Sequence, residues 1–248
     1  MRPIVAMLAL LLGVGSVAAE DRCPTPAISL NIETPIPLSP PARAWLEAQM
    51  RQATAKVCAW WGPSFTGAFT IDVVEVDGPS MALIPAWRGE RGRVMFPASR
   101  VRQGRAATVH EIVHVYAPNA NRFLAEGLAV YAHEKLGGPI AYPNFGASLH
   151  AAAAQHAQTD VAALERLATP SRLELDRLAD REAYLVAGSF VRFLIERHGL
   201  DTFRRLYAMT PLVPGQRNAG APARWREIYG LEFDQLVQMW RSSLGRSL

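Results

Sequence analysis

The sequence contains little lysine and only two cysteines. Lysine occurs only at Lys56 and Lys135, so nearly all of the 26 basic residues are arginines, set against 22 acidic residues. The resulting charge of +4 would fall to +3 if Arg2 were removed with an export signal. The arginines are scattered and form no dense basic run of the kind that binds nucleic acid. We therefore expect no nucleic-acid partner.

Long apolar runs are also missing, except at the start of the chain. Arg2 is followed by an apolar stretch over residues 4–17 and then by small residues, which is typical of a secretory signal covering residues 1–19. The stretch is shorter than the roughly 20 residues that a transmembrane helix needs. The charged residues just before Cys23 argue against a lipoprotein anchor. We expect a periplasmic or secreted protein with no stable membrane anchor after signal cleavage.

The two cysteines, Cys23 and Cys58, are an even pair in a chain predicted to be exported. In an oxidising compartment such a pair favours a disulfide. The bond would tie the N-terminal tail to the end of the first predicted helix. The alternative is a pair of unlinked buried thiols.

The composition is that of a globular protein, with 50% hydrophobic and 19% charged residues among 248. The patterns predict an α+β fold, with a small mixed sheet in the N-terminal half and a mainly helical C-terminal half. We expect a tail and helix over 20–64 and a domain over 65–248, together one compact unit over 20–248. The expected strands are 28–32, 65–76, 82–87 and 93–96, with a hairpin turn at 89–92. The expected helices are 40–60, a segment around residue 110 that ends at Pro118, 122–136, 147–158, 181–198, 201–209 and 232–244.

The segment His110-Glu111-Ile112-Val113-His114 carries the clearest chemical signal. Residues 108–116 contain no proline or glycine and show the apolar stripe of a buried helix. Two histidines four residues apart lie on one face of a helix, so both can reach one metal ion. Glu111 lies about 100° round the helix from His110, beside the metal and not on it. The alternative is that both histidines are ordinary core or surface residues.

A third ligand is needed for a hydrolytic zinc site. A metzincin would need glycine and histidine where this chain has Ala117 and Ala120, so that type is excluded. Glu126 follows a predicted turn and would complete a site of two histidines and one glutamate. Its alternative is an ordinary exposed helix glutamate. Gly127 weakens a helix by about 1 kcal/mol relative to alanine, which predicts a close approach of another segment at this point.

At these residues the chain resembles the gluzincin peptidases, specifically the peptidase MA-like group. In that group a motif of the form hydrophobic-x-x-Glu-Gly-x-Ala closely follows the first metal-binding helix, as residues 123–129 do here. Residues 181–199 are similar to a helical segment downstream in the same group, and the resemblance covers about 65–210. It implies a zincin-like fold in which 65–248 is a metallopeptidase domain, with zinc bound by His110, His114 and Glu126 and with Glu111 as general base. It also implies a mixed sheet whose edge strand holds an extended peptide.

The resemblance also implies a donor for the oxyanion that forms on the attacked carbonyl. Tyr184 is the expected donor, with Tyr142 and His150 as alternatives. Two features depart from thermolysin-like enzymes: the gap between the second and third ligands is shorter, and Val130 replaces an aspartate that orients a histidine ligand. The groups that orient the ligands are therefore unidentified. His133 is one candidate, and its alternative is a surface residue.

Together these features predict an exported zinc metallopeptidase acting on a peptide or protein substrate. Zinc would lower the pKa of its water to about 7, and Glu111 would remove the proton. A strand, either Ile71–Val76 or Arg93–Phe96, would pair with the substrate. One alternative is a catalytically silent zinc-binding protein with a role in periplasmic binding or assembly, and another is a zinc esterase or amidase. Neither the cleavage specificity nor the oligomeric state follows from the sequence.

Overall fold

The protein is described by a computed structural model over residues 23–76, 78–83, 91–166, 180–212 and 220–245. The predicted export signal lies outside these residues. Cys23 and Cys58 form a disulfide, as predicted, which ties the start of the described chain to the last turn of the first helix. No helix among the described residues has the length and apolar character needed to cross a membrane.

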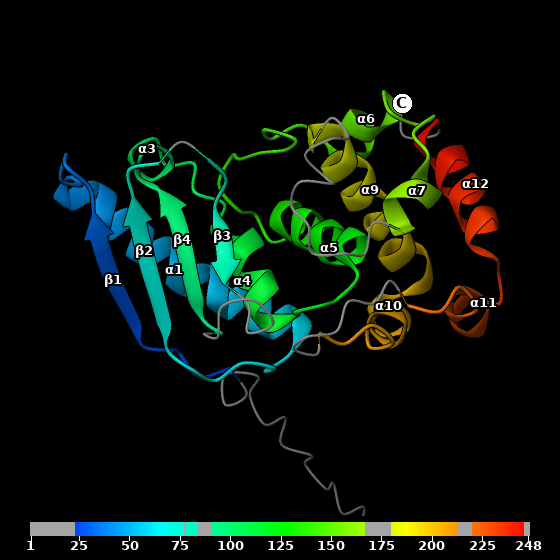
Figure 1. Ribbon diagram of the computed structural model, residues 1–248, viewed down its shortest axis with the longest axis horizontal. Coiled ribbons are helices and arrows are strands. Elements are labelled where there is room, and N and C mark those ends of the chain that lie inside the picture. Colours follow the sequence, from blue (N-terminus) through cyan, green and yellow to red (C-terminus); the bar gives the residue numbers. More distant parts are fainter. Residues whose placement is uncertain (1–22, 77, 84–90, 167–179, 213–219, 246–248) are drawn as a thin grey trace, which may run out of the picture.

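The N-terminal half forms a four-stranded sheet in the order β1-β2-β4-β3 (Figure 1). The strands are β1 (Ile28–Glu33), β2 (Phe69–Val74), β3 (Met81–Leu83) and β4 (Arg93–Pro97). β1 and β4 each run parallel to β2, whereas β3 pairs antiparallel with β4. The sheet is therefore mixed, and the α+β class is confirmed. The predicted pairing of β3 with β4 is also present, although the turn between them lies outside the described residues.

The prediction that β2 or β4 pairs with a substrate strand is wrong. Both strands lie inside the sheet and bond to a neighbour on each side. Their backbone groups are therefore already used within the sheet. The edges of the described sheet are β1 and β3, and β3 packs against the helix that carries His110.

Helix α1 (Pro40–Trp61) lies behind the sheet in Figure 1 and packs against α4 (Thr108–Tyr116). Its start is stabilised by Ser39, whose side chain accepts a hydrogen bond from the Ala42 N–H. It ends at Gly62, where a φ of 111° suits a residue without a Cβ.

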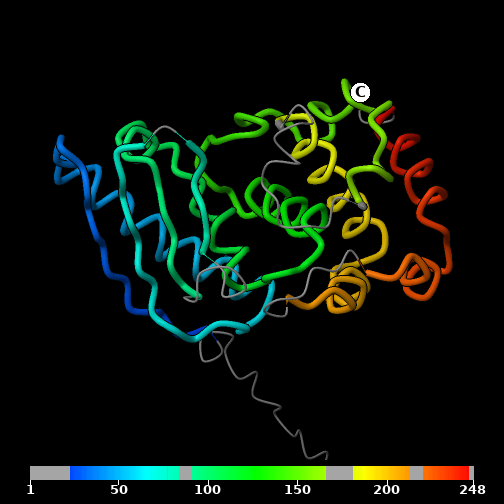
Figure 2. Tube along the Cα trace, viewed as in Figure 1, coloured from blue at the N-terminus to red at the C-terminus, as the bar shows by residue number. Residues whose placement is uncertain are grey.

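The remaining chain is helical, as predicted. The helices are α3 (Ala98–Arg102), α4 (Thr108–Tyr116), α5 (Arg122–Lys135), α6 (Leu149–Ala154), α7 (Val161–Arg166), α9 (Asp180–His198), α10 (Leu200–Tyr207), α11 (Arg224–Tyr229) and α12 (Phe233–Leu244). Figure 2 shows α4 and α5, in green, between the sheet and the later helices drawn from yellow to red. One continuous core joins the two halves. Helices α4 and α5 are therefore held from both sides.

Candidate metal centre

Helix α4 presents His110 and His114 on the face opposite its buried stripe. Ile112 and Val113 are fully packed in the core between α4, α1 and the sheet. The side chains of these two histidines are 12% and 14% exposed, respectively. Their imidazole rings lie 4.9 Å apart between centroids, one turn apart along the helix. The predicted geometry of the pair is present.

The turn that leads from α4 to α5 is fixed by polar contacts to the end of α10. Tyr207 donates its hydroxyl to the Ala117 carbonyl at 2.7 Å, and Asn119 donates to the Tyr207 carbonyl at 2.7 Å. The side-chain oxygen of Asn119, Oδ1, accepts a hydrogen bond from the Thr210 hydroxyl at 2.7 Å. Asn121 then caps α5 by accepting from the Leu124 N–H. This closed network sets the direction in which α5 leaves the turn.

Gly127 allows α5 to lie very close to α9. A Cβ at this position would sit 2.6 Å from the Ala187 carbonyl oxygen and 2.6 Å from a methyl group of Val191. The close approach predicted from the sequence is confirmed. Because Gly127 directly follows Glu126, the packing of α5 on α9 also determines where the Glu126 carboxylate lies.

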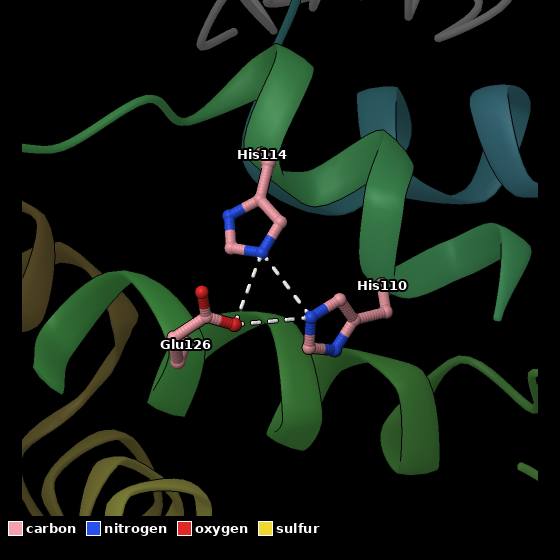
Figure 3. Close-up of side chains that lie close together, drawn as sticks. All are labelled: His110, His114 and Glu126. Carbon is pink, nitrogen blue, oxygen red and sulfur yellow. Dashed lines mark hydrogen bonds and ion pairs between the residues drawn. The ribbon is translucent and has the colours of Figure 1, made fainter. Parts of the chain in front are cut away.

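The three predicted ligands converge (Figure 3). The Nε2 atoms of His110 and His114 are 3.2 Å apart, and Glu126 Oε2 lies 3.2 Å from the first and 3.3 Å from the second. Ligands about 2.0–2.1 Å from a tetrahedral zinc ion are separated by about 3.3–3.4 Å. Two imidazole nitrogens and one carboxylate oxygen are also a donor set that zinc accepts. The residues present therefore fit a zinc ion.

Glu111 is buried beside this triad, and 4% of it is exposed. Burial raises the pKa of its carboxyl group to about 7. The nearby His110 opposes this rise and Glu126 adds to it, while a hydrogen bond from the Ala82 backbone in β3 also lowers the pKa. A carboxylate with a pKa near neutrality can both accept and return a proton, which is what a general base requires.

Glu126 has the opposite electrostatic character. Burial alone would raise its pKa, but His114 and His110 outweigh that effect and hold the pKa well below its usual range. Arg122, one turn earlier on α5, lies 3.7 Å from Glu126 Oε1 and lowers the pKa further. Glu126 is therefore anionic, as a metal ligand must be. The sequence prediction missed Arg122, although its spacing of four residues from Glu126 on a helix was a usable signal.

A cavity of about 310 Å³ opens beside the triad and contains the predicted oxyanion donor. Tyr184 lies on its wall, with its ring 6.3 Å from that of His110 and its hydroxyl 3.3 Å from an Arg122 nitrogen. Tyr142 lines the same cavity, with its ring 5.7 Å from that of Tyr184. Both tyrosine candidates are therefore at the site.

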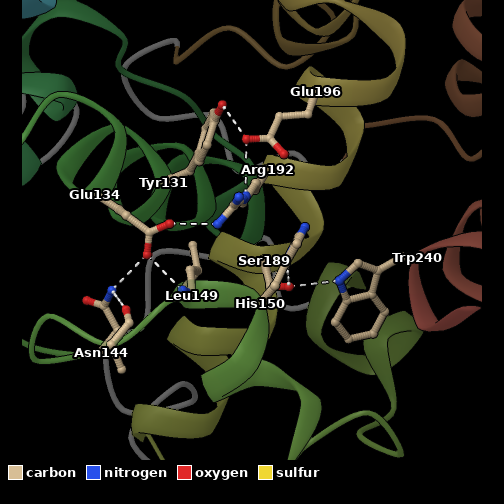
Figure 4. Close-up of polar contacts among 10 residues, drawn as sticks. Tyr131, Glu134, Asn144, Leu149, His150, Ser189, Arg192, Glu196 and Trp240 are labelled. Carbon is tan, nitrogen blue, oxygen red and sulfur yellow. Dashed lines mark hydrogen bonds and ion pairs between the residues drawn. The ribbon is translucent and has the colours of Figure 1, made fainter. Parts of the chain in front are cut away.

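The third candidate donor, His150, lies elsewhere. It is buried in a separate polar network, where its Nδ1 is 2.7 Å from the Ser189 hydroxyl and Trp240 donates to the same oxygen (Figure 4). In a second set of contacts, also drawn in Figure 4, Glu134 holds the loop that precedes α6, because it accepts from Asn144 and from the Leu149 N–H.

His133 does not orient the metal ligands, and it is not a surface residue either. It is 7% exposed, and its Nε2 bonds to the Pro139 carbonyl oxygen at 2.7 Å. Burial lowers its pKa to about 4, so the ring is neutral at pH 7. His133 is therefore a structural residue of the turn that follows α5.

Comparisons with family models, with curated proteins and with solved structures found no match to this chain. The function of this chain is therefore inferred from the site itself.

Proposed function

We propose that this protein is an exported zinc-dependent metallopeptidase of the gluzincin type, with a zincin-like fold. The observation that carries the proposal is the convergence of His110, His114 and Glu126, with the buried Glu111 carboxyl group beside them. A purely structural zinc site is usually closed by four protein ligands and has no use for such a carboxylate. The disulfide supports export, since such bonds persist in oxidising compartments.

Each residue has a separate task in the proposed reaction. His110, His114 and Glu126 would hold the ion, which when bound supplies Lewis acidity toward a water molecule and the attacked carbonyl. Glu111 takes the proton from the attacking water and returns it to the leaving amine. Tyr184, beside Arg122 on the cavity wall, donates a hydrogen bond to the oxyanion.

The decisive experiment replaces Glu111 by glutamine. The Glu111→Gln protein should retain zinc, measured by elemental analysis, because Glu111 is not a ligand. It should lose at least about 99% of its cleavage of a broad peptide library, since general base catalysis contributes roughly 10²–10⁴-fold. Glu47→Gln, an exposed change on α1, is the matched control and should keep both properties.

Three outcomes decide between this proposal and its alternatives. Zinc without turnover in the wild-type protein would favour a silent zinc-binding protein. Hydrolysis of simple esters or amides but of no peptide would favour an esterase or amidase. Full peptide cleavage by purified Glu111→Gln would refute the role of Glu111.

A further inference from the structure

The cavity beside the triad is lined by more positive charge than the proposed hydrolysis requires. Arg100, Arg105 and Arg122 all line it, whereas Glu111 is the only acidic residue among the lining residues that the structure describes. Arg122 already has Glu126 and Tyr184 as neighbours. Arg100 and Arg105 are exposed, and neither has a carboxylate partner among the residues that the structure describes.

The fold brings these two arginines to one wall. Arg100 lies on α3, and Arg105 follows the turn that ends this helix. The Arg105 N–H donates to the Arg100 carbonyl at 2.9 Å, and Gly104 between them has a φ of 66°. That left-handed conformation suits glycine and reverses the chain within a few residues. Two arginines of one short, defined segment therefore line the same cavity.

The other described lining residues outside α4 add no negative charge. They are Ser80 and the two residues before it, Ala107, Ala141 and the two tyrosines. Helix α4 begins next to Ala107, which also lines the cavity, and no side chain caps this end. The positive end of the helix dipole adds to the field of the arginines. A cavity in which positive charge predominates attracts ligands of negative charge.

We propose that this cavity selects peptide substrates that carry a carboxylate close to the cleaved bond, and that Arg100 and Arg105 recognise it. Guanidinium groups bind carboxylates through paired hydrogen bonds of matching geometry. The carboxylate belongs either to an aspartate or glutamate side chain or to the C-terminus of the peptide. This inference rests on the proposed peptidase function, which supplies the substrate class.

The test measures binding separately from cleavage. Zinc-loaded Glu111→Gln protein is titrated against fluorescent peptides that differ only by Glu, Gln or Lys at one central position, each with a free or an amidated C-terminus. We expect the preferred carboxylate to tighten binding by roughly tenfold or more, an effect that added salt weakens. A preference for the Glu peptide identifies a side-chain carboxylate, and a preference for the free C-terminus identifies a terminal one.

The preference should disappear when Arg100→Gln and Arg105→Gln are added. The matched control adds Arg51→Gln and Arg197→Gln, which remove the same charge from exposed positions outside the cavity. Zinc affinity should be equal in both proteins. Equal binding of all peptides, no measurable binding of any, or a preference that survives the double substitution would overturn the inference. Preferential binding without cleavage by the wild-type protein would instead refute the peptidase proposal alone, and cleavage without charge preference would refute the arginine site alone.

Discussion

Replacing Gly127 by alanine tests whether helix packing places the third ligand. Two effects of known size oppose each other at this position. Alanine favours a helix interior by about 1 kcal/mol relative to glycine. The added Cβ would, however, lie 2.6 Å from the Ala187 carbonyl oxygen and 2.9 Å from the Ala187 carbonyl carbon. These are backbone atoms of α9, so the conflict is relieved only by moving one helix away from the other.

Overpacking of this kind costs typically about 1–3 kcal/mol, and the rigid backbone places Gly127→Ala toward the upper part of that range. After the gain in helix propensity is subtracted, we expect the free energy of unfolding to fall by about 1–2 kcal/mol. Urea unfolding of the metal-free protein, followed by circular dichroism, measures this change. The control is Gly245→Ala, because a Cβ there meets nothing within 4 Å and φ is −74°. That change should stay within about 0.5 kcal/mol of the wild type.

The same substitution should weaken zinc binding. A displaced α5 moves Glu126 away from the two histidines of α4, so we expect the zinc dissociation constant to rise by about tenfold or more, in line with changes that disturb the supports of metal ligands. A Gly127→Ala protein that is as stable as the wild type, or more stable, and that binds zinc equally well would refute the packing argument.

Two further changes test other parts of the structure. His114→Ala should abolish the rise in unfolding temperature that zinc gives the metal-free wild type, whereas His156→Ala, outside the triad, should keep it; differential scanning calorimetry with and without zinc decides. In the His133→Gln protein, the free energy of unfolding should fall less as the pH is lowered. Burial lowers the pKa of His133 from 6.5 to about 4. The neutral buried ring therefore stabilises the fold fully above pH 6.5. As the pH falls from 6.5 toward 4, protonation of the unfolded chain lowers the free energy of unfolding by up to about 3 kcal/mol. Urea unfolding of the metal-free protein from pH 7 to pH 4 measures this change. If the free energy of unfolding depends on pH in the same way in the wild type and in His133→Gln, the buried neutral state of His133 is contradicted.

The parts of the site that could be predicted from the sequence are those set by local geometry. His110 and His114 are one helical turn apart in any helix. Glu126 comes soon after them, in the second turn of α5, which a short loop connects to α4. Gly127 carried its own signal, since a glycine inside a helix has a cost that only close packing explains. Such relations need only a few neighbouring residues.

The parts that could not be predicted depend on contacts between distant segments. The hydrogen bond from the Ala82 backbone to Glu111 requires β3 to be the edge strand beside α4. The order of strands in a sheet cannot be predicted from the sequence of any one strand. The burial of His133 has the same origin. Ten of the 14 residues of α5 are buried because α4 and α9 both pack against this helix, so no exposed face remains where His133 lies.

Two neighbouring segments contribute different residues to the candidate site. The proposed metal ligands come from α4 and α5, whose positions are fixed by the core and by the packing of α5 on α9. Arg100 and Arg105 come from α3 and the turn that follows it, a segment that contributes none of the three converging residues. Under the two proposals, a change in Arg100 or Arg105 should therefore alter which substrate binds without moving the ion. A change in the α5–α9 contact should alter both zinc binding and the cavity wall, because Arg122 and Tyr184 lie on these two helices and line the cavity.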